Sequence, residues 1–246
     1  MSNWRAHDSD GTMNRQEWNR LGKVFADEVC DIVREETSDE MKRYVAAAKL
    51  PKDATLVDFG CGVGTFIHRF GAKFKTIVGV EFAASAIAQA KVLCANRRDV
   101  RWMTADIVRA AKEIGRVADL TVCLNVITST SRAKRAALWQ SLADTTKRGG
   151  HTLIVVPSLE SEAMVQAIVN RGKKLKLAAK DGHVVREEAT QKFFEKAELR
   201  AVLAEAGFTL KKLGRAHYPW TIEGERETAS RAANRPWDWV CLAQRN

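Results

Sequence analysis

The sequence predicts an α/β fold with a doubly wound, mainly parallel sheet, on the basis of three observations. Short apolar segments alternate with segments of helical periodicity along most of the chain. Residues 120–127 are almost wholly apolar, as in a central parallel strand that is buried on both faces. Residues 56–67 pass from an apolar run through alternating glycines into a helical pattern, which indicates a strand, a tight loop and a helix. We therefore expect helices on both faces of the sheet.

Length and composition fit a single α/β domain. The 246 residues are 46% hydrophobic, which suffices for one large core. The five cysteines are scattered and form no C-x-x-C pair, as expected of reduced, buried thiols in the cytoplasm. No apolar run is long enough to span a membrane, and the N-terminus has no apolar signal region. We expect a cytoplasmic protein with no membrane partner.

The loop after the first strand points to a ligand. Gly60, Gly62 and Gly64 permit positive φ and leave the backbone bare, so a ligand can lie against it and against a helix N-terminus. The spacing G-x-G-x-G, followed by Thr65, matches neither the dinucleotide motif nor the nucleoside triphosphate loop. Asp58 would repel a pyrophosphate and suits a cationic group, such as that of a sulfonium amino acid nucleoside. The alternative is a turn that only allows tight packing.

Two further strands end in acidic residues. Residues 76–81 are apolar up to Glu81, which follows Asp58 by 23 positions. At about this spacing an acidic residue accepts hydrogen bonds from ribose hydroxyls in doubly wound folds. A third strand, beginning near residue 100, leads to Asp106. Each acid could instead be an ordinary solvent-facing strand end, but the three together favour a binding site.

In combination these segments resemble the class I S-adenosylmethionine-dependent methyltransferases. The stretches VDFGCGVG, VGVEFAASAIAQAK, WMTADI and ADLTVCLNVI occur in the order and spacing of that family, and the resemblance covers about residues 40–246. It implies a mainly parallel, seven-stranded sheet with an antiparallel last strand at 237–244, and S-adenosyl-L-methionine as cofactor. It also implies a methyltransferase domain over 51–246 and an N-terminal helical lid over 1–50.

The resemblance assigns roles to individual residues. Asp58 and the glycine loop would line the methionine part of the cofactor, Glu81 would hold the ribose hydroxyls, and Asp106 would accept from the adenine amino group. Two apolar residues would flank the adenine ring, and the end of the fourth strand would border the sulfonium and the substrate entrance. The implied cofactor-binding residues are Asp58, Gly60, Cys61, Gly62, Gly64, Glu81, Phe82, Asp106, Ile107, Asn125 and Val126.

Aromatic residues are the candidates for the acceptor pocket. Apolar residues recur at helical intervals from position 14 to 33, and a second helical piece is stopped by Pro51. A lid made of these helices would cover the mouth of the site, whereas the alternative is that their aromatics pack on the sheet. The candidate substrate-lining residues are Trp18, Phe25, Tyr44 and Trp220. We expect residues 158–190, with a helix over 160–170 and a turn at 181–182, to govern substrate choice.

Methyl transfer from a sulfonium requires little chemistry from the protein. It is an in-line displacement, so the protein mainly aligns the acceptor and excludes water. Where the acceptor must lose a proton, a positioned base helps, and His217 with neighbouring Tyr218 is the leading candidate, followed by Glu223 and Glu225. A lone histidine is more often a surface or packing residue.

Several other functions lack support in the sequence. The fourth strand ends without the N-P-P-Y or D-P-P-Y signature, no Pro-Cys pair is present, and the five histidines show no metal-ligand spacing. The net charge of +10 could attract nucleic acid, but the basic runs are short, separated and poor in aromatics.

We therefore expect methylation of a small soluble metabolite on nitrogen, oxygen or sulfur, without a metal. The alternatives are methylation of RNA or a protein side chain, and a non-catalytic relative that binds the nucleoside. The sequence leaves the oligomeric state open.

Overall fold

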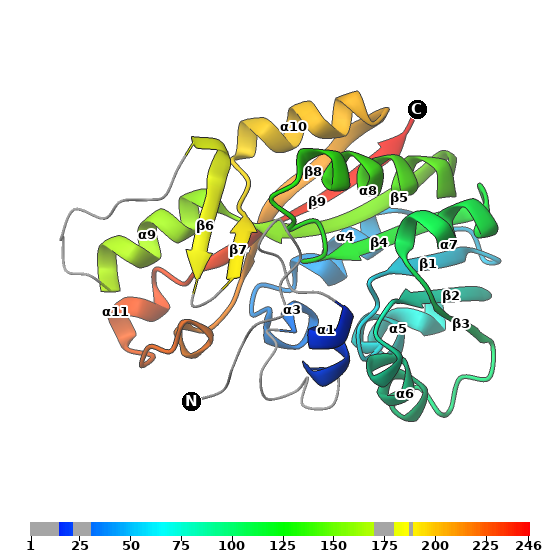
Figure 1. Cartoon of the computed structure of the whole chain (residues 1–246), viewed down its shortest axis with the longest axis horizontal. Coiled ribbons are helices and arrows are strands. Elements are labelled where there is room, and N and C mark those ends of the chain that lie inside the picture. Colours follow the sequence, from blue (N-terminus) through cyan, green and yellow to red (C-terminus); the bar gives the residue numbers. More distant parts are fainter. Residues whose placement is uncertain (1–14, 22–30, 170–179, 187–188) are drawn as a thin grey trace.

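The computed structural model describes residues 15–21, 31–169, 180–186 and 189–246. Within these ranges seven strands form one sheet in the order β3-β2-β1-β4-β5-β9-β8 (Figure 1). Neighbouring strands are parallel from β3 to β5, and β9 is antiparallel to both β5 and β8. The predicted fold class and the antiparallel last strand are thus confirmed. The strands are β1 (Thr55–Phe59), β2 (Thr76–Glu81), β3 (Val100–Thr104), β4 (Ala118–Leu124), β5 (Thr146–Pro157), β8 (Phe208–His217) and β9 (Trp237–Arg245).

Helices cover both faces of this sheet. One buried cluster joins the sheet to α4, α5 and α6, and a second joins its other face to α7, α8 and α10. Figure 1 shows α8 and α10 above the sheet and α5 and α6 below it. None of the described helices is long and apolar enough to cross a membrane. The helices are α1 (Arg15–Leu21), α3 (Ile32–Glu35), α4 (Glu40–Ala47), α5 (Thr65–Phe70), α6 (Ala84–Leu93), α7 (Ile107–Ile114), α8 (Arg132–Thr145), α9 (Leu159–Val169), α10 (Lys196–Glu205) and α11 (Ala229–Ala232), with 3-10 turns η1 (Gly71–Lys73), η2 (Lys180–Gly182) and η3 (Trp220–Glu223).

The central strands are apolar because both of their faces are covered. Leu56, Val57 and Phe59 of β1 are fully buried, as are Leu120 and Val122 of β4. Since β1, β2 and β4 are parallel, their carboxyl ends meet at one edge of the sheet. That edge is where ligands bind in folds of this type.

Within the helical stripe expected over 14–33, the described residues include helices α1 and α3, and the backbone at Asp31 is not helical. The candidate Phe25 lies outside the described residues. A new helix starts at Ile32 because Asp31 has extended backbone angles and its side chain accepts a hydrogen bond from the Val33 backbone N–H at 3.1 Å.

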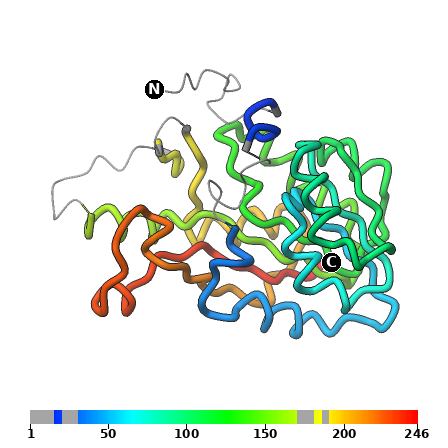
Figure 2. Tube along the Cα trace, turned by 90° about the horizontal axis from the view of Figure 1, so that it is seen from below, coloured from blue at the N-terminus to red at the C-terminus, as the bar shows by residue number. Residues whose placement is uncertain are grey.

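Segments from opposite ends of the chain pack together on one face of the sheet. Helix α4 lies alongside β8 and β9 (Figure 2). The backbone N–H of Thr37 donates to the carbonyl of His217 at 2.7 Å, and the Ser38 hydroxyl donates to the carbonyl of Arg215 at 3.2 Å. The segment before α4 is thereby fixed to the end of β8.

The segment after β5 contains a hairpin that the sequence did not predict. The expected helix is present as α9, but β6 (His183–Arg186) and β7 (Ala189–Lys192) then pair in antiparallel fashion. The helix expected over 192–206 begins only at Lys196, because the backbone N–H groups of Lys192 and Phe194 donate to the carbonyls of Thr128 and Pro157. These bonds hold the hairpin next to the carboxyl ends of β4 and β5.

Candidate functional site

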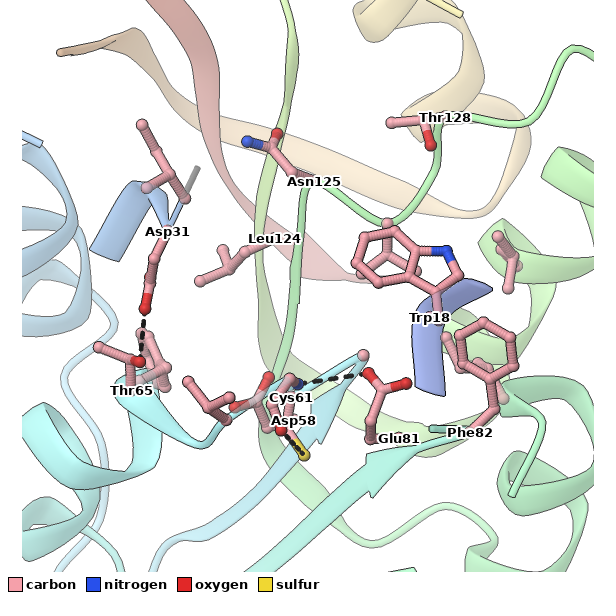
Figure 3. A pocket seen from close by; sticks show the side chains of 18 of the residues that line it. Trp18, Asp31, Asp58, Cys61, Thr65, Glu81, Phe82, Leu124, Asn125 and Thr128 are labelled. Atoms are coloured by element: carbon pink, nitrogen blue, oxygen red, sulfur yellow. Dashed lines mark hydrogen bonds between the residues drawn. The ribbon is translucent and has the colours of Figure 1, made fainter. Parts of the chain in front are cut away.

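A cavity of about 290 Å³ opens at the carboxyl edge of the sheet, where β1, β2 and β4 end (Figure 3). In that view Asp58, Cys61 and Glu81 lie at one end, and Asn125 and Thr128 lie at the other. The cavity is lined by Trp18, Asp31, Ile32, Val33, Asp58, Gly60, Cys61, Gly62, Val63, Thr65, Phe66, Glu81, Phe82, Ala105, Asp106, Ile107, Leu124, Asn125, Val126, Thr128, Ser129, Leu138 and Gln191. Ten of the eleven residues assigned to the cofactor from the sequence are among them.

The glycine loop forms the floor of the cavity. Gly60 has φ +71°, and a Cβ atom at this position would lie 2.3 Å from Cγ2 of Val126. Gly62 also has a left-handed backbone, with φ +51°. The backbone N–H groups of Gly60 and Cys61 donate to the carbonyl of Val80 at 2.8 and 3.0 Å, which ties the loop to the end of β2. The loop is therefore a fixed backbone surface.

Gly64 is the member of the expected set that the structure places outside the cavity. Its φ is +82°, and a Cβ atom there would lie 3.0 Å from Cβ of Ala90 and 3.2 Å from Cη2 of Trp102. The third glycine thus allows the start of α5 to pack closely against α6 and β3.

Asp58 lies at the end of β1 with 2% of its surface exposed. Its Oδ2 atom has no hydrogen-bond partner among the described residues. Burial, together with the smaller effects of the negative charges of Glu81 and Asp31, raises the pKa of Asp58 to about 8. A ligand with a positive charge or a hydrogen-bond donor could therefore supply the partner that Asp58 Oδ2 lacks.

Glu81, at the end of β2, is held against the glycine loop. Its Oε2 accepts from the Gly62 backbone N–H at 3.3 Å, and its Oε1 accepts from the Ala83 backbone N–H at 2.9 Å. Burial raises the pKa of this carboxyl group, and the backbone hydrogen bonds partly oppose that shift. Both oxygens are thus fixed in direction.

Asp106 has a structural role in addition to its place in the cavity wall. It is exposed, and its Oδ1 atom accepts from the backbone N–H groups of Val108 and Arg109 at 2.8 and 3.3 Å. These bonds cap the first turn of α7. The neighbouring Ile107 and Phe82, which follows β2, supply apolar surface to the cavity.

Helix α1 contributes Trp18 to the cavity, as expected from the sequence. The Trp18 ring lies near Phe82 in Figure 3. The helix is attached to the start of α6, because the Ser85 hydroxyl donates to the Asn19 carbonyl at 2.6 Å and the Ser85 backbone N–H donates to Asn19 Oδ1 at 3.4 Å. Trp18 is therefore held at the cavity by its neighbour in sequence.

Tyr44, a candidate for lining the substrate pocket, lies outside the cavity lining. It is 5% exposed and belongs to the buried cluster beneath the sheet, where its hydroxyl approaches Gly214 of β8. A Cβ atom on Gly214 would lie only 2.5 Å from that hydroxyl. Burial and the nearby Glu40 raise the pKa of Tyr44. Tyr44 is therefore a packing residue, and the expectation that it lines the substrate pocket is corrected.

The candidates near the end of β8 also lie outside the cavity lining. His217 shares a hydrogen bond of 3.1 Å between Nδ1 and the Arg235 carbonyl, and the Tyr218 hydroxyl donates to Glu223 at 2.9 Å. Trp220 is fully buried, and its Nε1 donates to the Arg231 carbonyl at 2.9 Å. The three side chains hold the segment between β8 and β9 in place, so the structure does not bring them to the site.

Several polar cavity residues were missed by the sequence analysis, among them Asp31, Thr128 and Gln191. Asp31 caps α3 and also accepts from the Thr65 hydroxyl at 2.5 Å, which joins the N-terminal segment to the glycine-loop helix. Gln191 comes from β7, immediately after the segment expected to govern substrate choice, and Thr128 follows β4. Of these three, only Gln191 had a sequence signal, namely its position next to that segment.

Asn125 has an unusual position at the end of β4. Its backbone is left-handed, with φ +55°, and its backbone N–H donates to the Val155 carbonyl at 2.9 Å. Its side-chain Nδ2 donates to Oδ2 of Asp238 at 2.7 Å. Asp238 belongs to β9 and was not singled out from the sequence.

Comparison with known proteins assigns the chain to a family. A family model described as a methyltransferase domain matches residues 32–213, which is more than half of the chain. The protein belongs to this methyltransferase family. The match, together with the fold, confirms its identification as a class I S-adenosylmethionine-dependent methyltransferase.

Solved methyltransferases share the fold at low sequence identity. The 1,6-didemethyltoxoflavin-N1-methyltransferase of Burkholderia thailandensis is 13% identical, with 94% of this chain and 87% of that chain covered and a TM-score of 0.66. The magnesium protoporphyrin IX methyltransferase of Synechocystis is 17% identical, with 97% and 90% covered and a TM-score of 0.56. The third structure is a complex of the Haloferax volcanii Trm112 methyltransferase activator with a methyltransferase. It is 13% identical, with 93% of this chain and 97% of that chain covered and a TM-score of 0.67. No significant match was found among curated proteins.

Proposed function

We propose that the methyltransferase binds S-adenosyl-L-methionine in this cavity and methylates a small soluble molecule. The observation that carries the first part is the buried, unpartnered Oδ2 atom of Asp58 beside a bare glycine loop. A ligand with a cationic group satisfies that atom, while its chain lies on backbone that a side chain at Gly60 would obstruct. The residues present therefore fit the cofactor.

Different cavity residues would contact different parts of the cofactor. Asp58 faces the amino acid part, Glu81 accepts from the ribose hydroxyls, and Asp106 accepts from the adenine amino group through the oxygen that does not cap α7. Phe82 and Ile107 flank the adenine ring. When bound, the sulfonium supplies both the methyl group and the leaving group.

The protein's own contribution is alignment and the exclusion of water. Trp18 and Leu138 add apolar walls to the cavity, and Thr128, Ser129 and Gln191 add polar groups at the side of β4 and the β6–β7 hairpin. An acceptor entering between α1 and this hairpin would reach the end of β4. No dedicated base is required for an acceptor atom that is nucleophilic without first losing a proton.

A small acceptor is supported by the confined cavity. The cavity of about 290 Å³ is near the lower end of the range for small-molecule sites, and part of it must hold the cofactor. By their titles, two structural neighbours act on 1,6-didemethyltoxoflavin and magnesium protoporphyrin IX, and another forms a complex with an activator protein. The protein or RNA acceptor is the alternative, and a non-catalytic nucleoside-binding role is a third hypothesis.

Calorimetry tests cofactor binding. Titration of S-adenosylmethionine into the protein should give a saturable heat that is lost in Asp58→Ala with an unchanged circular dichroism spectrum. A cation next to Asp58 lowers its pKa, so binding at pH 7 should release up to one proton and the heat should vary with the buffer. Affinity should rise as the pH approaches 8. The exposed Asp144→Ala is the control, and undiminished binding by Asp58→Ala contradicts the assignment.

A transfer assay tests the acceptor class. The protein is incubated with tritiated S-adenosylmethionine and cell extract that has been split into small-molecule and macromolecular fractions. Label in the small-molecule fraction supports the proposal, and label in the RNA or protein fraction supports the alternative. Binding without any transfer supports the non-catalytic role.

A further inference from the structure

The side-chain amide of Asn125 has a fixed orientation at the acceptor end of the cavity. Its backbone is anchored to β5 through the hydrogen bond to Val155, and its left-handed φ sets the direction of the side chain. In Figure 3 this side chain lies away from Asp58 and Glu81. It therefore belongs to the part of the cavity that the cofactor-binding carboxylates do not occupy.

Asp238 determines which amide atom is available to a ligand. Its carboxylate is 6% exposed and lies in β9 opposite Pro157 of β5 and Ala216 of β8. An ionised carboxylate only accepts hydrogen bonds, so the Asn125 Nδ2 group must face it, as the 2.7 Å contact indicates. The amide oxygen then points away from Asp238.

The amide oxygen has no partner among the described residues. Asn125 Oδ1 is buried and receives no hydrogen bond from any described residue. Buried polar atoms in folded proteins are nearly always hydrogen-bonded, and an exception in a cavity wall indicates a group that a ligand supplies. Because the atom is an acceptor, the missing partner is a donor.

We propose that Asn125 Oδ1 accepts a hydrogen bond from the methyl acceptor, and that Asp238 is the positioning residue that holds the amide in this orientation. The substrate class is then a small molecule with an N–H or O–H group at or beside the atom that is methylated. Acceptors that carry no N–H or O–H group on the methylated atom or next to it are excluded. An amide oxygen is too weak a base to remove the proton, so its role is recognition. When the methylated atom itself carries the hydrogen, the protonated product of methyl transfer loses its proton to water.

This inference rests on the proposed function, and the experiment separates the two. S-adenosylhomocysteine is first titrated into the protein by calorimetry. If it does not bind, the proposed function is wrong and the inference is wrong with it. If it binds, the saturated complex is used with matched probe pairs, phenol against anisole and indole against 1-methylindole, at millimolar concentration. Each pair differs by one methyl group in place of the donated hydrogen.

The readout is the ¹⁵N side-chain amide signal of Asn125, assigned as the signal that disappears in Asn125→Gly. The hydrogen-donating member of each pair should shift this signal and bind about three- to tenfold more tightly than its methylated partner, which is the ratio expected for one net hydrogen bond. Equal binding of both members, or no shift by either donor, overturns the proposal.

Two variants test the roles of the paired residues. The asparagine in Asp238→Asn can donate as well as accept, so it no longer fixes the orientation of the Asn125 amide. The ratio of the two affinities within each probe pair should then fall toward one. Asn125→Gly tolerates the positive φ and removes the acceptor, with the same result. The control is Asp144→Asn, because Asp144 accepts from the Gln140 amide at 2.8 Å on exposed α8. A preference that persists in both Asp238→Asn and Asn125→Gly overturns the proposal.

Discussion

Glu81 and Gly62 are joined by a hydrogen bond of 3.3 Å from the glycine backbone N–H to the carboxylate Oε2. The acid at the end of β2 therefore positions the loop at the end of β1. The second oxygen accepts from the backbone N–H of Ala83, so the same side chain also fixes the start of the segment that leads into α6. One residue thus orders both sides of the cavity floor.

Replacement of Glu81 by Gln should disturb this arrangement although the shape is retained. The new NH₂ group must face either the Gly62 or the Ala83 N–H, and two donors cannot bond to each other. We expect a loss of about 1–3 kcal/mol in the free energy of unfolding and weaker cofactor binding. Chemical denaturation and calorimetry measure the two effects. Glu113→Gln, in an exposed ion pair with Arg101, should change neither, and a stable, tight-binding Glu81→Gln would contradict the role.

Asp58 should make the ligand-free protein less stable as the pH rises. Its pKa is about 8 in the folded state and about 3.8 in an unfolded chain, so between these limits the folded state binds one proton more than the unfolded state. That stabilisation is complete below about pH 4 and is lost as the pH rises through 8. Asp58→Asn has no such proton. Thermal unfolding at a series of pH values should therefore show that the stability of the variant rises relative to that of the wild type up to about pH 8. Parallel plots of unfolding temperature against pH for the two proteins would contradict the assignment.

The sequence could predict the part of the cavity that we assign to the cofactor because its signals are local. Asp58 and Glu81 lie at the ends of apolar strands, Asp106 follows the next strand, and parallel strands bring such ends together without further information. Gly60 and Gly62 are required by backbone conformation, which spacing reveals.

The residues in the part of the cavity that we assign to the methyl acceptor could not be predicted in this way, because their positions depend on contacts between distant segments. Asp238 meets Asn125 only because β9 inserts antiparallel next to β5, and Tyr44 is withdrawn from the cavity by packing on β8. His217 lies at the correct edge of the sheet but is used by the Arg235 carbonyl. Aromatic and histidine residues alone do not indicate which of these outcomes occurs.

Asp106 allows its two roles to be separated by a pair of substitutions. Asparagine is as good a helix cap as aspartate, whereas alanine loses the cap at a cost of about 1 kcal/mol. Asp106→Asn should therefore keep the stability of the protein and still weaken cofactor binding, because an adenine amino group bonds less strongly to a neutral acceptor. Asp106→Ala should lose both. Thermal unfolding and calorimetry distinguish them, and equal binding in all three proteins would mean that Asp106 only caps α7.

Gly60 and Gly224 provide a matched test of the close approach in the glycine loop. Both have a φ of +71°, but an added Cβ atom meets Val126 at 2.3 Å in the first case and nothing within 4 Å in the second. Alanine at either position should cost about 1–2 kcal/mol for the left-handed backbone. Gly60→Ala should cost about 1–3 kcal/mol more through overpacking and should also weaken cofactor binding. Adding Val126→Ala removes the two closest contacts, so the double variant should recover part of the stability in a denaturant titration. Equal losses in Gly60→Ala and Gly224→Ala, with no recovery in the double variant, would show that backbone conformation alone requires glycine at position 60.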